Sequence, residues 1–262
     1  MWPEGARVAV SFTFDFDAEE VWVADDPSYE SRPVGLSQGA YGAKVAVPAI
    51  LELLARHGIS ATFFVPGKVA EEHPDRVREI VEAGHELACH GYRHRHPARM
   101  TAEEEELEVA HAREVLDAFG APVVGYRAPG WDLSTRTLDL IASAGFTYSS
   151  NFMDRLHPYV HPEGLVELPV SWVLDDAPHF WFDAESWTKK IATTSEVREI
   201  WEAELLGIRE VGGVCVLTMH PQVIGRPSRL RFLDAFIGWT LGLGDAWVAT
   251  CGQIAGAVRG VA

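Results

Sequence analysis

The stretch that decides the fold is Gly84-His85-Glu86-Leu87-Ala88-Cys89-His90-Gly91-Tyr92-Arg93-His94. Its first half is a short apolar run after a glycine, which is typical of a strand that enters a loop. Its second half holds two histidines four residues apart, and such a pair lies on one face if the chain makes a helical turn. Neutral imidazole is the commonest metal ligand, although an isolated pair at this spacing is more often a surface accident. A third, anionic ligand nearby would complete an open, catalytic type of metal site.

Candidates for that anionic ligand end the first predicted strand. Apolar and polar residues alternate through residues 7–17, which indicates a strand by its period of two. Asp15 and Asp17 therefore project from the same face at the carboxyl end of the strand. Two neighbouring carboxylates are costly unless a cation or a shared proton separates them. The alternative is a pair of solvated loop acids.

Strands and helices alternate along the whole chain, which favours a mainly parallel sheet. The predicted strands are residues 7–17, 60–65, the run that leads to His90, 122–126, 146–149, 165–169, 213–219 and 247–249. Helical periodicity covers residues 44–57, 75–83, 101–119, 134–144, 195–211, 228–243 and the chain from residue 252. Seven to eight such units predict an α/β fold, a closed or nearly closed barrel. No linker or internal repeat divides the chain, so we expect residues 1–262 to form one domain.

The candidate functional residues fall just past the ends of predicted strands: Asp15, Asp17, His90, His94, Arg127 and His220. In a parallel barrel these carboxyl ends meet at one mouth, where the chemistry gathers. Residues 25–42, rich in Gly, Pro, Ser and Asp, read as a long loop, and so do the aromatic and acidic residues 170–182. Both loops could cover this mouth.

The charge and the cysteines limit the partners and the compartment. The formal net charge is −16 over 262 residues, which argues against nucleic acid and anionic membrane surfaces. No apolar run reaches the roughly 18 residues that a membrane span needs. Three widely spaced cysteines form no disulfide framework, and no secretory signal begins the chain. We therefore expect a cytoplasmic protein with no membrane and no nucleic-acid partner.

These side chains, brought together, would suit hydrolysis of an amide-like C–N bond. A metal ion lowers the pKa of water and polarises a carbonyl group. A second carboxylate can take the proton of the water, and a histidine on the far side can protonate the leaving nitrogen. An arginine beside the carboxylate would keep it ionised and oriented.

The order of the motifs resembles the polysaccharide deacetylase (NodB-homology, carbohydrate esterase family 4) superfamily. Five segments match it: Thr13-Phe14-Asp15-Phe16-Asp17, His90-Gly91-Tyr92-Arg93-His94, Arg127-Ala128-Pro129-Gly130-Trp131, Trp172 to Asp176, and Leu217-Thr218-Met219-His220. The match extends from about residue 7 to the end of the chain. The resemblance implies a distorted (β/α) barrel, NodB-like, with about seven parallel strands.

The resemblance also implies roles for these residues. The metal ligands map to Asp17, His90 and His94. The base maps to Asp15, the arginine that tunes it to Arg127, and the acid to His220. The ligand set suits one divalent metal ion, Zn²⁺ first, with Co²⁺, Mn²⁺ or Ni²⁺ as alternatives.

Two departures from the family pattern bear on these roles. The two aspartates are adjacent in the family, whereas Phe16 separates them here, so the ligand and base roles of Asp15 and Asp17 could be exchanged. Gly130 is inserted before Trp131.

Five further residues are candidates for substrate contact: Trp131, Glu19, Trp172, Asp176 and Arg226. Glu19 could instead solvate a loop. Arg226, close to His220 in the sequence, could bind a substrate carboxylate or brace its loop. A carboxylate at residue 175 or 176 could keep His220 charged for part of the time.

Details around residues 172–176, 218–221 and 225–227 resemble a cytoplasmic subgroup of cyclic imidases, allantoinase-like enzymes and peptidoglycan deacetylase-like proteins, often homotetrameric. The first hypothesis is therefore a metal-dependent hydrolase of small amides or cyclic imides. The alternatives are a metal-independent, allantoinase-like ureide hydrolase, a deacetylase of N-acetyl sugars or peptidoglycan, and a non-catalytic sugar-binding module. Intact Asp17, His90 and His94 speak against the metal-independent enzyme, and retention of both acid and base speaks against the binding module.

Overall fold

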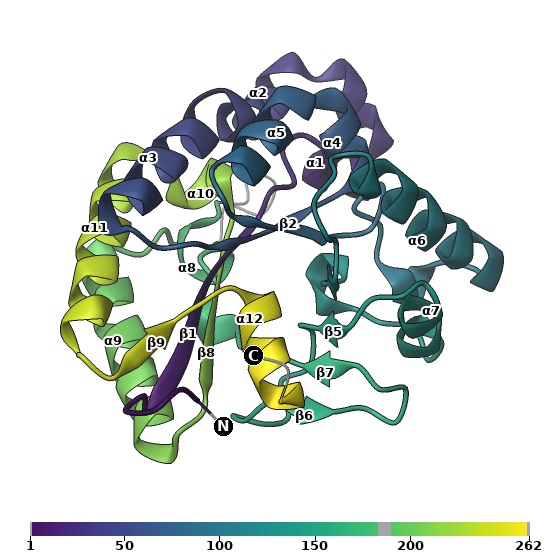
Figure 1. Cartoon of the computed structure of the whole chain (residues 1–262). Coiled ribbons are helices and arrows are strands. Elements are labelled where there is room, and N and C mark those ends of the chain that lie inside the picture. Colours follow the sequence, from purple (N-terminus) through teal and green to yellow (C-terminus); the bar gives the residue numbers. More distant parts are fainter. Residues whose placement is uncertain (1, 183–189, 261–262) are drawn as a thin grey trace.

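The computed structural model describes residues 2–182 and 190–260. Its central feature is a curled sheet with helices packed around the outside (Figure 1). The strand order is β6-β7-β5-β4-β3-β2-β1-β8, and β9 also pairs with β1. The strands are β1 (Val8–Asp15), β2 (Thr62–Val65), β3 (Glu86–Cys89), β4 (Gly125–Tyr126), β5 (Tyr148–Ser149), β6 (Tyr159–Val160), β7 (Val166–Glu167), β8 (Val214–Met219) and β9 (Ala246–Val248).

The helices lie mostly on the outer face of the sheet, except that the last of them packs inside the curl (Figure 1). They are α1 (Glu20–Asp25), α2 (Pro33–Tyr41), α3 (Val47–His57), α4 (Gly67–Glu72), α5 (Pro74–Glu82), α6 (Ala102–Asp117), α7 (Thr137–Ser143), α8 (Ala177–Phe180), α9 (Thr194–Val211), α10 (Pro221–Ile224), α11 (Pro227–Gly242) and α12 (Cys251–Arg259). Within residues 2–182 and 190–260, none of these helices is long and apolar enough to cross a membrane.

Strand β1 organises the sheet because it pairs along its whole length. Its residues are all buried, so both of its faces are covered. It pairs with β8 from Ala9 to Phe14, with β9 near its start and with β2 near its end. One face of β1 is apolar and belongs to the hydrophobic cluster under the outer helices: Val8, Val10, Phe12 and Phe14. The other face begins with Ala9, in the cluster inside the curl, and continues with buried polar residues: Ser11, Thr13 and Asp15. The period of two predicted for residues 7–17 therefore separates an apolar face from a mainly polar one.

The structure confirms the predicted fold class, an α/β fold with a curled, mainly parallel sheet. The count differs, because nine strands occur among the described residues, whereas eight segments were predicted as strands and the family resemblance implied about seven. The unexpected strand is β6, which pairs antiparallel with β7 as a two-residue edge. A segment this short carries too little periodicity to be recognised.

The prediction of a long loop at residues 25–42 is wrong. This segment contains the end of α1, a 3-10 helix (Pro27–Ser31) and α2, and it runs into a π-helix (Gly42–Ala46). Pro27 and Pro33 are first helical residues, where the missing N–H has no helical partner to lose. The prolines and glycines that indicated a loop are thus compatible with short helices.

Candidate active site

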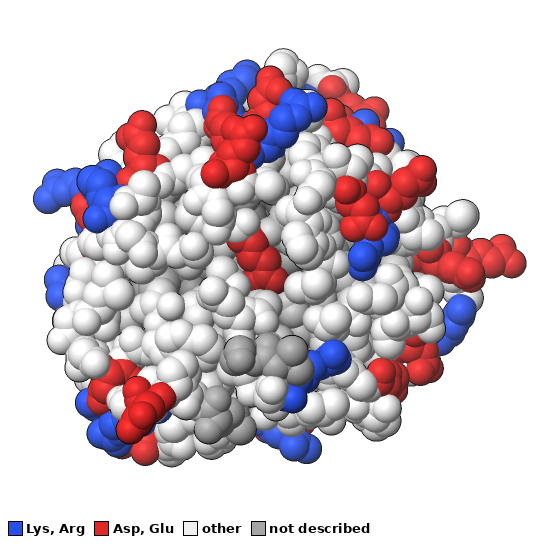
Figure 2. Space-filling view, viewed as in Figure 1, with Lys and Arg blue, Asp and Glu red and all other residues white. Residues whose placement is uncertain are grey.

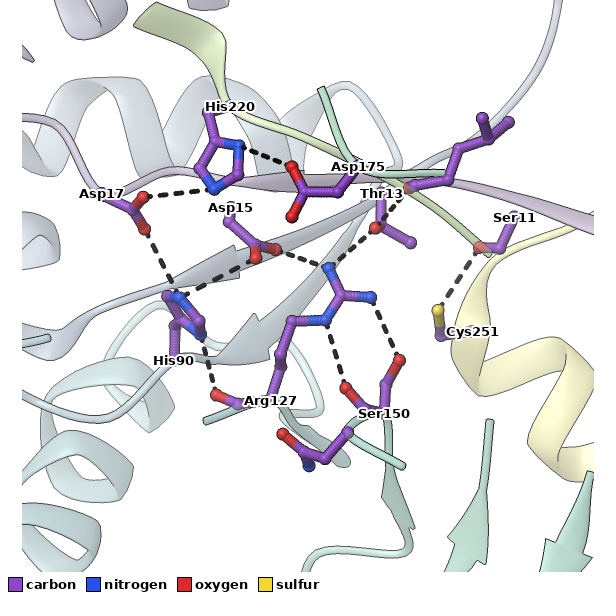
Figure 3. Close-up of polar contacts among 12 residues, drawn as sticks. Ser11, Thr13, Asp15, Asp17, His90, Arg127, Ser150, Asp175, His220 and Cys251 are labelled. Carbon is purple, nitrogen blue, oxygen red and sulfur yellow. Dashed lines mark hydrogen bonds and ion pairs between the residues drawn. The ribbon is translucent and has the colours of Figure 1, made fainter. Parts of the chain in front are cut away.

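Asp17, His90 and His94 converge at the mouth of the curled sheet (Figure 3 shows Asp17 and His90). Asp17 lies just past β1, and the histidines lie just past β3. Oδ1 of Asp17 is 3.5 Å from Nε2 of His90 and 3.6 Å from Nε2 of His94. All three residues are buried. One ligand atom from each lies within 4.8 Å of the others, so the three could share one ion.

The chemistry of these three residues fits a divalent cation. Both carboxylate oxygens of Asp17 are buried without a hydrogen-bond partner among the described residues, which is costly unless a cation compensates. Nδ1 of His90 donates a hydrogen bond to the carbonyl of Arg127 at 2.8 Å, so the lone pair of Nε2 is available to bind a metal ion. Burial lowers the pKa of His90 to about 4 and that of His94 well below its usual value, so both imidazoles are neutral.

Asp15 is held by a buried arginine. Nη1 of Arg127 donates to Oδ1 of Asp15 at 2.6 Å and to the Thr13 hydroxyl at 2.9 Å. Nη2 donates to the Ser150 hydroxyl at 3.1 Å, and the guanidinium lies 4.0 Å from the ring centroid of Phe64. These contacts fix one oxygen of Asp15. The other oxygen, Oδ2, lies 3.8 Å from Nε2 of His90, beside the three candidate ligands (Figure 3).

His220, just past β8, is oriented by Asp176. Nδ1 of His220 lies 2.7 Å from Oδ1 of Asp176, and the backbone N–H of His220 donates to Oδ2 at 3.0 Å. Nε2 is then left for the site, 3.8 Å from Oδ2 of Asp17. Burial lowers the pKa of His220, but the carboxylates of Asp176, Asp175 and Asp17 outweigh burial and raise it well above its usual value. An imidazolium at this position can donate a proton.

The loop that carries His94 is anchored by Glu108 of α6, a residue that the sequence analysis did not single out. Oε2 of Glu108 accepts the backbone N–H groups of Tyr92 and Arg93 at 3.0 and 2.9 Å, and Oε1 accepts Nε of Arg95 at 3.0 Å. The loop needs this support because His94 has a φ of 55°, in the left-handed region. Nothing in the sequence distinguished Glu108 from the glutamates at residues 103–106 that precede it.

Left-handed backbone is concentrated at this site. Among the described residues, three that are not glycine have a positive φ: Ala18 at 46°, His94 at 55° and Trp131 at 54°. Ala18 follows Asp17, and Trp131 lines the cavity described next. Such conformations cost free energy and persist where the surrounding contacts impose them. The strain is therefore located in the loops that carry the candidate ligands.

The convergent residues lie in a cavity of about 610 Å³, a size typical of small-molecule sites. Aromatic side chains form much of its wall: Trp22, Tyr29, Trp131, Trp172 and Trp181. The rings of Trp131 and Trp172, both expected to contact substrate, lie 4.5 Å apart. Residues 25–38 and 172–182 do contribute to the wall, although both segments predicted as loops contain short helices.

Three of the expected substrate contacts, Glu19, Arg226 and Asp176, do not line this cavity. The carboxylate of Glu19 pairs with Nε2 of His73 at 2.8 Å, and Glu19 does not line the cavity. Arg226 lines a neighbouring cavity. Asp176 contacts His220 rather than the cavity wall.

Cys89, beside His90, is buried in the hydrophobic core, and burial raises the pKa of its thiol to about 12, which suits a structural residue.

The sequence analysis missed Trp22 and Trp181, whose rings stack at 5.0 Å between centroids. Trp181 belongs to an aromatic stretch that sequence alone could not assign to core or pocket. Trp22 precedes the segment that was taken for a loop, so nothing indicated its direction. Ser150, which holds Arg127, follows a two-residue strand and carries no motif.

Known proteins share this architecture and these motifs. A family model described as polysaccharide deacetylase matches residues 38–149. A peptidoglycan deacetylase of Helicobacter pylori is 30% identical, over 88% of this chain and 89% of the relative. A crystal structure titled "putative polysaccharide deacetylase from Mycobacterium smegmatis" has a TM-score of 0.96 and 43% identity, over 99% of this chain and 93% of that chain.

A solved allantoinase has a TM-score of 0.82 at 23% identity, over 97% of this chain and 91% of that chain, and shows the fold alone. The similarity to the Helicobacter relative covers nearly the whole of both chains and agrees with the convergent site. The chain therefore belongs to the polysaccharide deacetylase (NodB-homology) family and is a hydrolase of carbon–nitrogen bonds other than peptide bonds.

Proposed function

We propose that the protein is a metal-dependent hydrolase that cleaves the amide or cyclic imide bond of a small molecule. One observation carries this proposal: Asp15, paired with Arg127, lies 3.8 Å from one candidate ligand, and His220, paired with Asp176, lies 3.8 Å from another. A ligand set of three leaves coordination positions open for a reaction.

In this proposal each side chain has one task. A divalent ion held by Asp17, His90 and His94 would lower the pKa of water and polarise the substrate carbonyl. Oδ2 of Asp15 takes the proton of the water, while Arg127 keeps Asp15 ionised and fixed through Oδ1. Nε2 of His220 donates a proton to the leaving nitrogen.

We propose one such ion per chain, with Zn²⁺ preferred and Co²⁺, Mn²⁺ or Ni²⁺ as alternatives. One carboxylate and two imidazoles suit all four ions, so availability and geometry would select among them. The buried carboxylate of Asp17, which has no hydrogen-bond partner among the described residues, favours this over the metal-independent, allantoinase-like alternative.

The proposed substrate is small, uncharged or modestly charged, and not a polymer, because the cavity measures about 610 Å³ and aromatic side chains form much of its wall. A second candidate is deacetylation of an N-acetyl sugar. The name of the Helicobacter pylori relative, a peptidoglycan deacetylase, favours it. The same side chains would serve both reactions, since each cleaves a bond between an acyl carbon and nitrogen.

A substrate screen with measured metal content tests these proposals. Purified protein is depleted of metal and reloaded with each of the four ions. It is then assayed on succinimide-type imides, on ureides, on N-acetylglucosamine and on chitin oligomers. Metal-restored turnover of imides is the expected result. Turnover of ureides by the depleted protein would support the metal-independent alternative, and turnover of chitin oligomers alone would refute the small-substrate proposal.

We also propose that residues 1–262 form one domain, that the protein is cytoplasmic and that it forms a homotetramer. Three buried, unpaired cysteines suit a reducing compartment. Acidic groups outnumber basic ones, and both lie mostly around the rim of the face in Figure 2, which offers no broad basic surface to nucleic acid. Limited proteolysis, cell fractionation and light scattering test the three statements in turn.

A further inference from the structure

A second cavity of about 240 Å³ adjoins the candidate active site. The two cavities share lining residues, among them Gln38 and the stacked pair Trp22 and Trp181. The two cavities therefore lie side by side, with these shared residues at their boundary. Two arginines, Arg226 and Arg229, line the second cavity.

Neither arginine has a carboxylate partner among the described residues. The guanidinium of Arg226 lies 3.8 Å from the ring centroid of Tyr41, and the Tyr41 hydroxyl donates to the carbonyl of Gly225 at 3.0 Å. This stacking fixes Arg226 without using its N–H donors. Arg229 lies 4.8 Å from the ring centroid of Phe180, and within residues 2–182 and 190–260 only its Nη1 has a hydrogen-bond partner, the Val223 carbonyl at 3.0 Å.

A buried amide completes the wall. Gln222 is 5% exposed and lines the second cavity, and both its amide oxygen and nitrogen lack a partner among residues 2–182 and 190–260. A buried amide without partners is costly unless a ligand or water supplies them. Arg226 also immediately precedes α11, a sixteen-residue helix whose amino end favours anions.

The charges of the two cavities are opposite. Carboxylates line the first cavity: Asp15, Asp17, Asp25, Asp26 and Asp175. Burial lowers the pKa of the Arg229 guanidinium, Asp176 raises it, and the nearby charge of Arg226 lowers it again. A bound anion would relieve the repulsion between the two arginines.

We propose that the second cavity binds a carboxylate of the substrate whose C–N bond lies in the first cavity. This inference rests on the proposed function and narrows its substrate class to small amides or imides that carry an acidic group. Two guanidinium groups supply the donors, as they commonly do for carboxylates, and the Gln222 amide can supply one more. Gln38, Trp22 and Trp181 would contact the part of the substrate that joins the two groups.

Calorimetric titration tests this proposal without requiring turnover. The probes are linear dicarboxylates from succinate to adipate and the neutral diamides of the same lengths, added to Zn²⁺-loaded protein. We expect at least one dicarboxylate to bind about tenfold or more tightly than its diamide, the usual size of a charge-assisted contact. Arg226→Gln and Arg229→Gln should each remove that preference.

Arg231→Gln is the matched control, because Arg231 is exposed on the same helix and lines neither cavity. It should keep the wild-type preference, and circular dichroism should show that all three variants are folded. No preference at any length, or a preference that survives in both cavity variants, overturns the proposal. Turnover of neutral amides without such a preference would refute this inference alone, while the preference without any turnover would refute the proposed function alone.

Discussion

Nη1 of Arg127 lies 2.6 Å from Oδ1 of Asp15, although β2 and β3 separate their strands in the sheet. Both side chains are almost fully buried, so the bond crosses the interior of the curl. A flat sheet would hold these strand ends far apart, since neighbouring strands lie roughly 4.8 Å apart. The curl of the sheet thus brings the candidate base and its partner together.

Asp15→Asn should retain metal and lose most activity. The amide keeps the shape of the carboxylate but cannot accept the proton of the water, so kcat should fall by roughly 10²–10⁴-fold. Turnover and metal content, measured on the same sample, check this. Asp17→Asn is the matched comparison and should lose metal affinity. Metal lost from Asp15→Asn but kept by Asp17→Asn would exchange the two roles.

His90→Ala and His94→Ala should each lose metal, because one carboxylate and one imidazole rarely retain a divalent ion in a protein. Elemental analysis after dialysis measures the loss. His96→Ala serves as the control: His96 lines the same cavity but is not among the three candidate ligands. Full occupancy in both His90→Ala and His94→Ala would contradict the assignment.

Asp176→Asn should move the alkaline limb of the pH–rate profile to lower pH. The carboxylate raises the pKa of His220, and removing its charge lets burial lower that pKa. As the pH rises, His220 would then lose its proton, and with it the ability to donate one, at a lower pH than in the wild type. The profile of kcat/KM reports this limb in the free enzyme. Asp139→Asn, at an exposed position on α7, should leave the limb in place.

His220→Ala should keep the fold and the metal while kcat falls by roughly 10²–10⁴-fold, and the alkaline limb should disappear. Circular dichroism, elemental analysis and the pH–rate profile check the three parts. Near-normal kcat would exclude His220 as the acid. A metal-free variant would instead make it a ligand.

Glu108→Ala should weaken metal binding by about 10–100-fold, the usual effect of losing an outer contact that orients a ligand. The loop from Tyr92 to His94 would lose the acceptor for two backbone N–H groups. Competition with a chelator measures the affinity. Glu106→Ala, exposed on the same helix, is the control and should bind metal normally. Unchanged affinity in Glu108→Ala would show that the loop holds its shape without this contact.

Gly125→Ala should destabilise the fold by about 1–3 kcal/mol, as overpacking of a core usually does. A Cβ at Gly125 would lie 1.9 Å from Cζ of Tyr148, on the neighbouring strand. Chemical denaturation measures the free energy of unfolding. Gly207→Ala, in α9 with nothing near the added atom, should be neutral or stabilising. Equal stability of the two variants would count against this packing of β4 on β5.

The sequence by itself determined the alternation of strands and helices and the positions where candidate site residues leave the strands. Both follow from local patterns: the period of two in residues 7–17, the capping residues of α6, and the polar residues after apolar runs. Short motifs in a fixed order then indicated the family. Such local patterns can be recognised in the sequence because consecutive residues of one helix or strand share a backbone conformation.

Only the tertiary structure decided which distant side chains meet. The sheet's curl pairs Asp15 with Arg127, and the packing of α6 places Glu108 under the His94 loop. Arg229 of α11 and Trp22 of α1, which are far apart in the sequence, line the same second cavity. These contacts depend on the relative position of whole elements, which is set by the sum of many small packing interactions along the chain. No local pattern encodes that sum, so the sequence indicated Trp131, Trp172 and Arg226 as contacts but not the places of Trp22, Trp181 and Arg229.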